Sequence, residues 1–64
     1  MQAFQQRVVD EKAELDEKLS KLDAFVLTGK FDALPNAEQE RMQRQQKAMG
    51  EYSAVLGERI AAFT

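Results

Sequence analysis

Apolar residues in the first part of the chain recur mostly at every third or fourth position. They are Phe4, Val8, Leu15, Leu19, Leu22 and Val26. This spacing places apolar side chains on one stripe of an α-helix, whereas a half-buried β-strand would place them at every second position. The positions between them carry mostly charged and polar residues. The pattern therefore predicts an amphipathic helix over residues 3–28.

A second apolar series begins after the connecting segment. Met42, Met49, Leu56 and Phe63 follow one another at intervals of seven, with Ile60 beside them. We predict a helix over residues 36–63 and a loop over residues 29–35. Gly29 is expected to end the first helix in the left-handed conformation. The second helix begins either with Asn36 as N-cap and Gln39 completing a capping box, or with Pro35 as its first residue.

Two helices joined by a short connection pack antiparallel. We therefore predict an all-α fold, an antiparallel two-helix hairpin, with residues 1–64 as a single domain. If the turn centres near residues 31 and 32, Phe4 lies level with Phe63. At the other end, Phe31 and Leu34 are expected to fold back over the hairpin near Phe25 and Met42. A chain this short buries only about 60% of its unfolded surface, so the hairpin is marginal on its own.

The second helix is apolar around most of its circumference, and the first helix covers only one side of it. A stripe of small residues, Gly50, Ala54, Gly57 and Ala61, lies beside the seam. Glycine inside a helix costs roughly 0.5–1 kcal/mol relative to alanine, which favours a close approach by another chain over glycine that is merely tolerated on a surface. We predict a homo-oligomeric helical bundle, a homodimer or homotetramer, with this stripe as the interface.

Composition excludes several classes of function. The chain has no Cys and no His, which excludes disulfides, thiolate or imidazole metal sites and histidine-dependent catalysis. Nine basic and eleven acidic residues give a net charge of −2, without the basic surface that duplex nucleic acid requires. We also find no glycine-rich phosphate loop and no apolar run long enough for a membrane. We expect a soluble cytoplasmic protein that is not an enzyme and holds no cofactor or metal.

Polar residues also occupy positions beside the second seam. Glu38, Gln45, Tyr52 and Arg59 recur every seven residues, and Arg7 and Glu11 lie on the same flank of the facing helix. In the antiparallel alignment, the group Arg7, Glu11, Tyr52 and Arg59 falls within about two turns, roughly 11 Å, and is expected to be semi-buried. It is either a structural network that sets the register or a pocket where Arg binds phosphate, Tyr stacks on a base and Glu accepts a hydrogen bond. Both roles are compatible.

A second basic group surrounds the start of the second helix. It consists of Lys30, Arg41, Arg44 and Lys47. The group is either solvated surface or a second place to hold an anion, aided by the positive end of the helix.

The segments RVVDEKAELDEKLSKLDAFV, F-x-x-L-P and EQERMQRQ…AMGEYSAVLGERIAAF together resemble a widespread family of very short proteins of tailed phages and prophages. Some short helical phage proteins are sponges that bind the cyclic nucleotide signals of bacterial immunity (CBASS and Thoeris) and keep them from their effectors. The resemblance implies such a role in the host bacterial cytoplasm. It also implies a ligand pocket lined by Arg7, Glu11, Gln45, Tyr52 and Arg59, with Arg41 as an outer contact.

A different class of function fits the same pattern. An exposed apolar helix face also serves to bind another protein, so a small interaction module for a host or phage protein is the alternative hypothesis. A third hypothesis is a structural component of the virion, but no feature of the sequence favours it.

Overall fold

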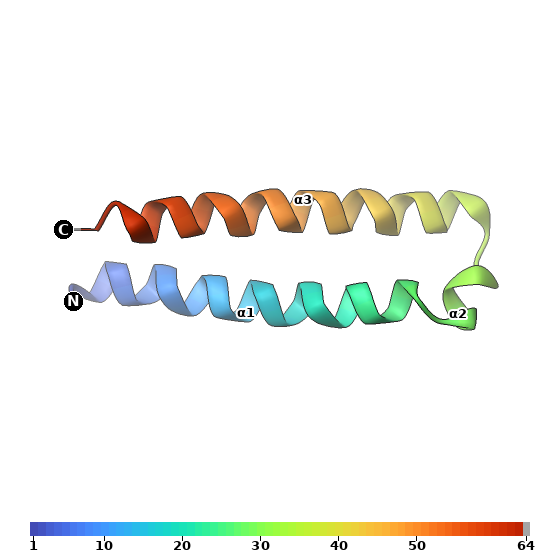
Figure 1. Cartoon of the computed structure of the whole chain (residues 1–64), viewed down its shortest axis with the longest axis horizontal. Helices are drawn as coiled ribbons and strands as arrows, with labels where there is room; N and C mark the ends of the chain where they lie inside the picture. The colour runs from blue at the N-terminus through green and yellow to red at the C-terminus, as the bar shows by residue number, and fades with distance from the viewer. Residues whose placement is uncertain (64) are drawn as a thin grey trace.

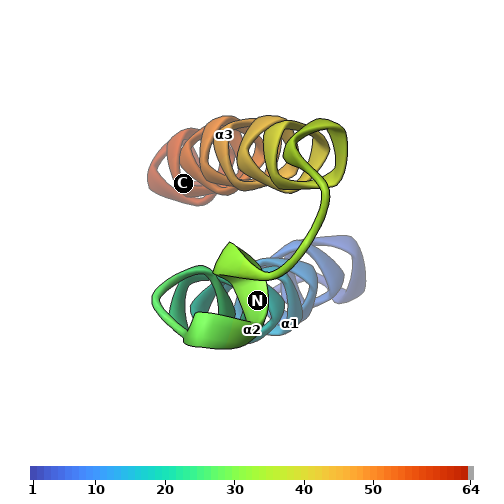
Figure 2. The same cartoon turned by 90° about the vertical axis from the view of Figure 1, so that its right-hand side faces the viewer.

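The structure is a computed structural model that describes residues 1–63, and it contains three helices. These are α1 (Ala3–Val26), α2 (Gly29–Asp32) and α3 (Asn36–Ala61). No β-strand occurs between residues 1 and 63, so the predicted all-α class is confirmed. In Figure 1, α1 and α3 lie side by side and run in opposite directions, and the end view in Figure 2 agrees. The molecule is elongated, with Cα extents of 47 × 14 × 13 Å.

The connection differs from the predicted loop because it contains the short helix α2. The first helix ends at Val26, and no glycine among residues 1–63 has a positive φ, so the left-handed role predicted for Gly29 is wrong. Hydrogen bonds of extended Thr28 are found here instead: its Oγ1 donates to the Phe25 carbonyl at 2.7 Å and accepts from the Phe31 amide at 3.4 Å. One hydroxyl thus serves the end of α1 and the start of α2.

The start of α3 lies at the predicted residue but has a different cap. Pro35 occupies the N-cap position with φ −54°, so the expectations of Asn36 as N-cap and of Pro35 as first helical residue are both wrong. The Gln39 side chain turns back to the connection, where Nε2 donates to the carbonyls of Asp32 at 3.2 Å and Leu34 at 2.9 Å. These bonds supply partners for carbonyls that no helix satisfies.

Aromatic pairs lie at both ends of the helical pair, as the register predicted. Phe4 meets Phe63 edge-on, with ring centroids 6.1 Å apart, where the termini lie. Phe31 is buried and meets Phe25 edge-on at 6.4 Å. Between these ends the core is thin, since Val8 and Leu56 are the other buried apolar residues among residues 1–63. The remaining seam residues are partly exposed, as expected of a single layer of two helices.

Candidate functional site

Three polar side chains form a network between α1 and α3. Lys12 Nζ donates to Asp16 Oδ2 at 2.9 Å, one turn along α1, and to Ser53 Oγ on α3 at 2.8 Å. Ser53 is buried at 8% exposure, and its hydroxyl donates to Asp16 Oδ1. The ring of contacts therefore satisfies the buried hydroxyl as both donor and acceptor.

The network also changes the electrostatics of Asp16. The hydrogen bonds from Ser53 and then Lys12 lower the pKa of this carboxyl below its ordinary value of 3.8. Burial opposes them, and the positive charge of Lys12 adds a smaller lowering effect. These partners stabilise the charged form of the carboxylate. A second polar contact between the helices joins Gln46 Nε2 to Asp23 Oδ1 at 2.7 Å, nearer the connection.

The predicted ligand residues lie outside this network. The side of α3 that faces α1 carries Gln46, Ser53 and Ile60, which are buried or half-buried. Each of them directly follows one of the predicted ligand residues Gln45, Tyr52 and Arg59. One residue corresponds to about 100° around a helix, so they occupy a neighbouring face. All six predicted residues, including Arg7, Glu11 and Arg41, are exposed. The expectation of a semi-buried group is therefore wrong for one chain.

Few contacts tie the predicted residues to one another. Among residues 1–63, no ion pair joins Glu11 to Arg7 or Arg59, so a salt bridge that sets the register is absent there. Arg41 Nε lies 3.3 Å from Glu38 Oε1 on the surface of α3. Gln45 Nε2 lies 3.7 Å from the Met49 sulfur. The register contact comes instead from Lys12, Asp16 and Ser53.

The small-residue stripe is partly occupied by the chain itself. A Cβ added at Gly57 would lie 3.5 Å from Lys12 Cε, so the lysine stem fills the space beside this glycine. A Cβ at Gly50 would meet nothing within 4 Å. Ala54 and Ala61 are exposed. The predicted role of the stripe as an interface between chains remains a prediction.

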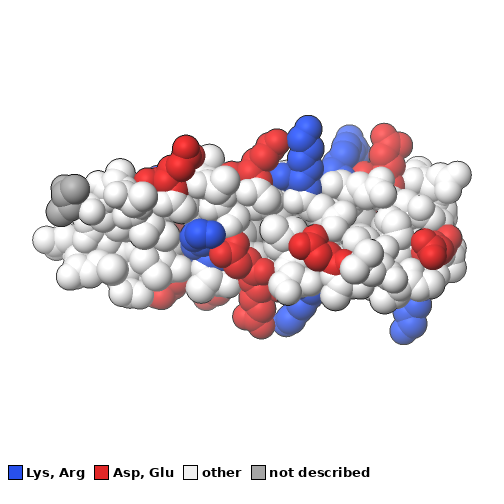
Figure 3. Space-filling view, viewed as in Figure 1, with Lys and Arg blue, Asp and Glu red and all other residues white. Residues whose placement is uncertain are grey.

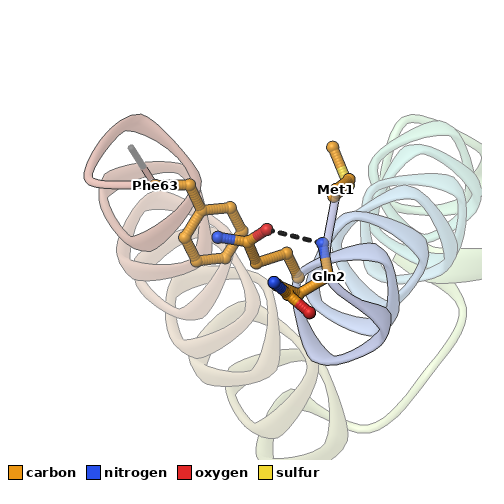
Figure 4. Close-up of a pocket in the computed structure, with 4 residues that line it drawn as sticks. Met1, Gln2 and Phe63 are labelled. Atoms are coloured by element: carbon orange, nitrogen blue, oxygen red, sulfur yellow. Dashed lines mark hydrogen bonds between the residues drawn. The ribbon is translucent and has the colours of Figure 1, made fainter.

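The end of the molecule that carries both termini holds a shallow pocket of about 450 Å³. It is lined by Met1, Gln2, Gln5 and Phe63. The backbone N–H of Gln2 donates to Gln5 Oε1 at 2.8 Å. Figure 4 shows the Phe63 ring facing these residues. None of the lining side chains is charged, and none belongs to the predicted ligand group. The charged groups visible in Figure 3 also lie away from this end.

A comparison with models of protein families matches residues 2–62 to the family described as Sequestin. The chain belongs to the Sequestin family. This match confirms the inference that nearly the whole sequence follows the pattern of one family. No curated protein matches the chain, and no solved structure does.

Two other kinds of feature are absent from residues 1–63. No helix there is both long and apolar enough to cross a membrane. No group of three or more acidic side chains is arranged to hold a metal ion in this part of the chain.

Sequence reasoning missed Lys12 and Ser53 because their residue types are polar, although their spacing contained the signal. Lys12 lies four residues after Val8 and three before Leu15, which fills the gap in the first apolar series. Ser53 lies four residues after Met49 and three before Leu56, so it fills the second. Two polar residues at such positions in a pair of packed helices indicate a contact between the helices.

Proposed function

We propose that this member of the Sequestin family is a non-catalytic, oligomeric sponge that sequesters a cyclic nucleotide signal of bacterial immunity, of the CBASS or Thoeris type. The observation that carries the proposal is the family match, which spans residues 2–62 and whose name denotes sequestration. In this proposal the protein is encoded by a phage and acts in the host bacterial cytoplasm. A sponge acts by stoichiometric binding, so it requires affinity for the signal but no reacting groups.

The predicted ligand residues have the chemistry that a cyclic nucleotide requires. A guanidinium presents paired N–H donors that match two phosphate oxygens, and among residues 1–63 neither Arg7 nor Arg59 is in an ion pair. Tyr52 is 45% exposed, so its side chain is accessible to a base that could stack on the ring. Glu11 and Gln45 are exposed and able to bond to base edges.

One chain offers these side chains on an open surface. A ligand bound there would stay largely in water, and small-molecule sites normally enclose most of their ligand. We therefore include a homodimer or homotetramer in the proposal, because additional copies would enclose the ligand between chains.

The proposal is tested by thermal unfolding of the purified chain with a panel of cyclic dinucleotides, cyclic trinucleotides and cyclic ADP-ribose isomers. At a hundredfold excess over Kd, binding to the folded state stabilises it by about 2.7 kcal/mol. Arg59→Ala should abolish the shift, whereas Lys21→Ala, which removes a cation that is 76% exposed and paired with Glu17, should keep it. The proposal fails if no compound in the panel stabilises the unaltered protein.

An alternative function is a small module that binds a host or phage protein. It is favoured by the apolar side chains that remain exposed, such as Phe4 at 53% and Val55 at 50%. Solvent accessibility of these residues in the purified protein tests it, for example by hydroxyl-radical footprinting. Protection of both residues in the absence of any partner would remove the reason for this alternative.

A further inference from the structure

The side of α3 that α1 leaves uncovered carries a second regular series. Ala48, Tyr52, Val55, Arg59 and Ala62 are spaced by four and three residues in alternation, and all five are exposed. This alternation is the spacing of a coiled-coil seam, and four of its five members are apolar or aromatic. We call it the outer seam of α3. The seam that faces α1 contains other residues, such as Met49 and Leu56.

The surface area of the chain indicates that such a face is covered. A compact monomer of 7.3 kDa exposes about 4,200 Å², whereas this chain exposes 4790 Å². The difference, about 600 Å², approaches the roughly 800 Å² that each partner buries in a standard interface. The excess follows from the elongated shape, which a second helical pair packed alongside would correct.

The charges beside the outer seam are distributed for self-association. Arg44 and Lys47 lie in the half of α3 near the connection, and Glu51 and Glu58 lie in the half near the C-terminus. Along the upper edge of the molecule in Figure 3, acidic groups toward the chain ends are followed by basic groups and then, nearest the connection, by acidic atoms again. The first half of α3 also holds Glu38 and Glu40, so the complementarity is confined to the middle of the helix. When two such helices pack antiparallel, the stretch with Arg44 and Lys47 in each faces the stretch with Glu51 and Glu58 in the other.

We infer that the outer seam of α3 is the contact between two copies of this chain. The two α3 helices pack antiparallel about a twofold axis level with Glu51 and Tyr52, so that Arg44 of one copy lies opposite Glu58 of the other. The inference deepens the proposed function, because Tyr52 and Arg59 belong to the seam. Two copies therefore bring both sets of these ligand residues together at the contact between the α3 helices.

A pair of matched substitutions tests which face is used. Val55→Glu places a charge in the outer seam, and Ala54→Glu places the same charge on the adjacent exposed residue, in the small-residue stripe. Sedimentation equilibrium of the full chain should show a dimer or larger species that Val55→Glu weakens at least tenfold and Ala54→Glu leaves unchanged. A monomeric unaltered chain, or an equal or larger effect of Ala54→Glu, would overturn the inference.

A charge exchange tests the antiparallel pairing and does not depend on Val55→Glu remaining folded. Arg44 and Glu58 are 14 positions apart, roughly 21 Å along the helix, too far to contact each other within one chain. Arg44→Glu and Glu58→Arg should each weaken association, and the double variant should restore it. Additive losses would contradict the pairing.

These measurements need no ligand, so the inference and the proposed function fail separately. An oligomer that dissociates with Val55→Glu but binds no cyclic nucleotide removes the proposed function and keeps the interface. A monomer that binds a cyclic nucleotide removes the interface and keeps the ligand binding of the proposed function, without its oligomeric part.

Discussion

Lys12 on α1 donates a hydrogen bond of 2.8 Å to Ser53 on α3, which links residues 41 positions apart. The bond lies within the interface between the helices, where the rest of the contact is mostly apolar. Apolar side chains tolerate a shift of one helix along the other better than directional hydrogen bonds do. A shift by one turn, about 5.4 Å, would break the bonds of Ser53 to both Lys12 and Asp16. The network therefore selects one register.

Removing the hydroxyl should lower the stability of the helical pair. Ser53→Ala deletes two hydrogen bonds to charged groups and leaves Lys12 and Asp16 with only each other, for an expected loss of about 1–3 kcal/mol in the free energy of unfolding. Urea unfolding followed by circular dichroism measures this loss. Ser20→Ala is the control, because Ser20 is exposed on α1. Equal stabilities of the two variants would show that the network contributes nothing.

The same network predicts an acid-sensitive part of stability. The pKa of Asp16 is lowered in the folded chain below the ordinary 3.8, so the unfolded state binds this proton more readily than the folded state. The contribution is therefore complete above the unfolded pKa and is lost as the pH falls through the folded pKa. Asp16→Asn should be less stable than the unaltered chain at pH 7, and the gap should close below pH ~3.8.

Unfolding of the two proteins between pH 7 and pH 2 checks this expectation. Asp10→Asn is the matched control, since Asp10 accepts a hydrogen bond from Gln6 within α1 and makes none to α3. A constant gap between Asp16→Asn and the unaltered chain would contradict the role of the charged carboxylate.

The two glycines of α3 provide a test that separates stability from association. Neither has a positive φ, and an added Cβ meets Lys12 Cε at an ordinary 3.5 Å at Gly57 and nothing within 4 Å at Gly50. Gly50→Ala and Gly57→Ala should each stabilise the fold by about 0.5–1 kcal/mol through helix propensity. If the outer seam is the interface, both variants should associate as the unaltered chain does. Weaker association of Gly50→Ala would instead favour the small-residue stripe.

Much of the fold could be predicted because helical periodicity reports which side chains face a neighbouring helix. Val8 and Leu56 were expected in the seam and are buried, and Phe4 lies level with Phe63. The details of the connection depend on single hydrogen bonds that periodicity does not encode. The hydroxyl of Thr28 begins a new helix where the glycine pattern predicted only an ending.

The candidate site could be predicted only in part, for a different physical reason. Periodicity assigns Tyr52 and Arg59 to one flank of α3, but their burial depends on whatever covers that flank. In one chain Tyr52 is 45% exposed. Any burial of these residues would have to come from a second chain, and periodicity within one sequence does not report such a contact.

The cap at the connection should be worth a measurable amount. Thr28→Ala removes the acceptor of the Phe31 amide and the donor to the Phe25 carbonyl, and loss of such a cap typically costs about 1 kcal/mol. Thr28→Ser keeps the hydroxyl and should lose much less. Urea unfolding of the pair isolates the hydroxyl, and equal losses in both variants would assign the effect to the methyl group.

Tyr52 has two groups with which it could hold a nucleotide base, its ring and its hydroxyl. If the ring stacks on the base, Tyr52→Phe keeps the aromatic face and should bind as the unaltered chain does. Tyr52→Ala removes the face and should lose about 1–3 kcal/mol, or about 5- to 150-fold in Kd. If the hydroxyl bonded to the base edge instead, Tyr52→Phe would already show the loss. Calorimetric titration with the cyclic nucleotide found in the panel distinguishes these cases.

Because Tyr52 also belongs to the outer seam, sedimentation of each variant must accompany the titration. Loss of affinity in a Tyr52→Ala protein that keeps its oligomeric mass assigns the ring to the ligand. Loss of affinity together with dissociation assigns it first to the contact between copies, because a ligand site built from two chains cannot outlast their separation. An unchanged Kd in an intact oligomer would place the base elsewhere and remove Tyr52 from the site.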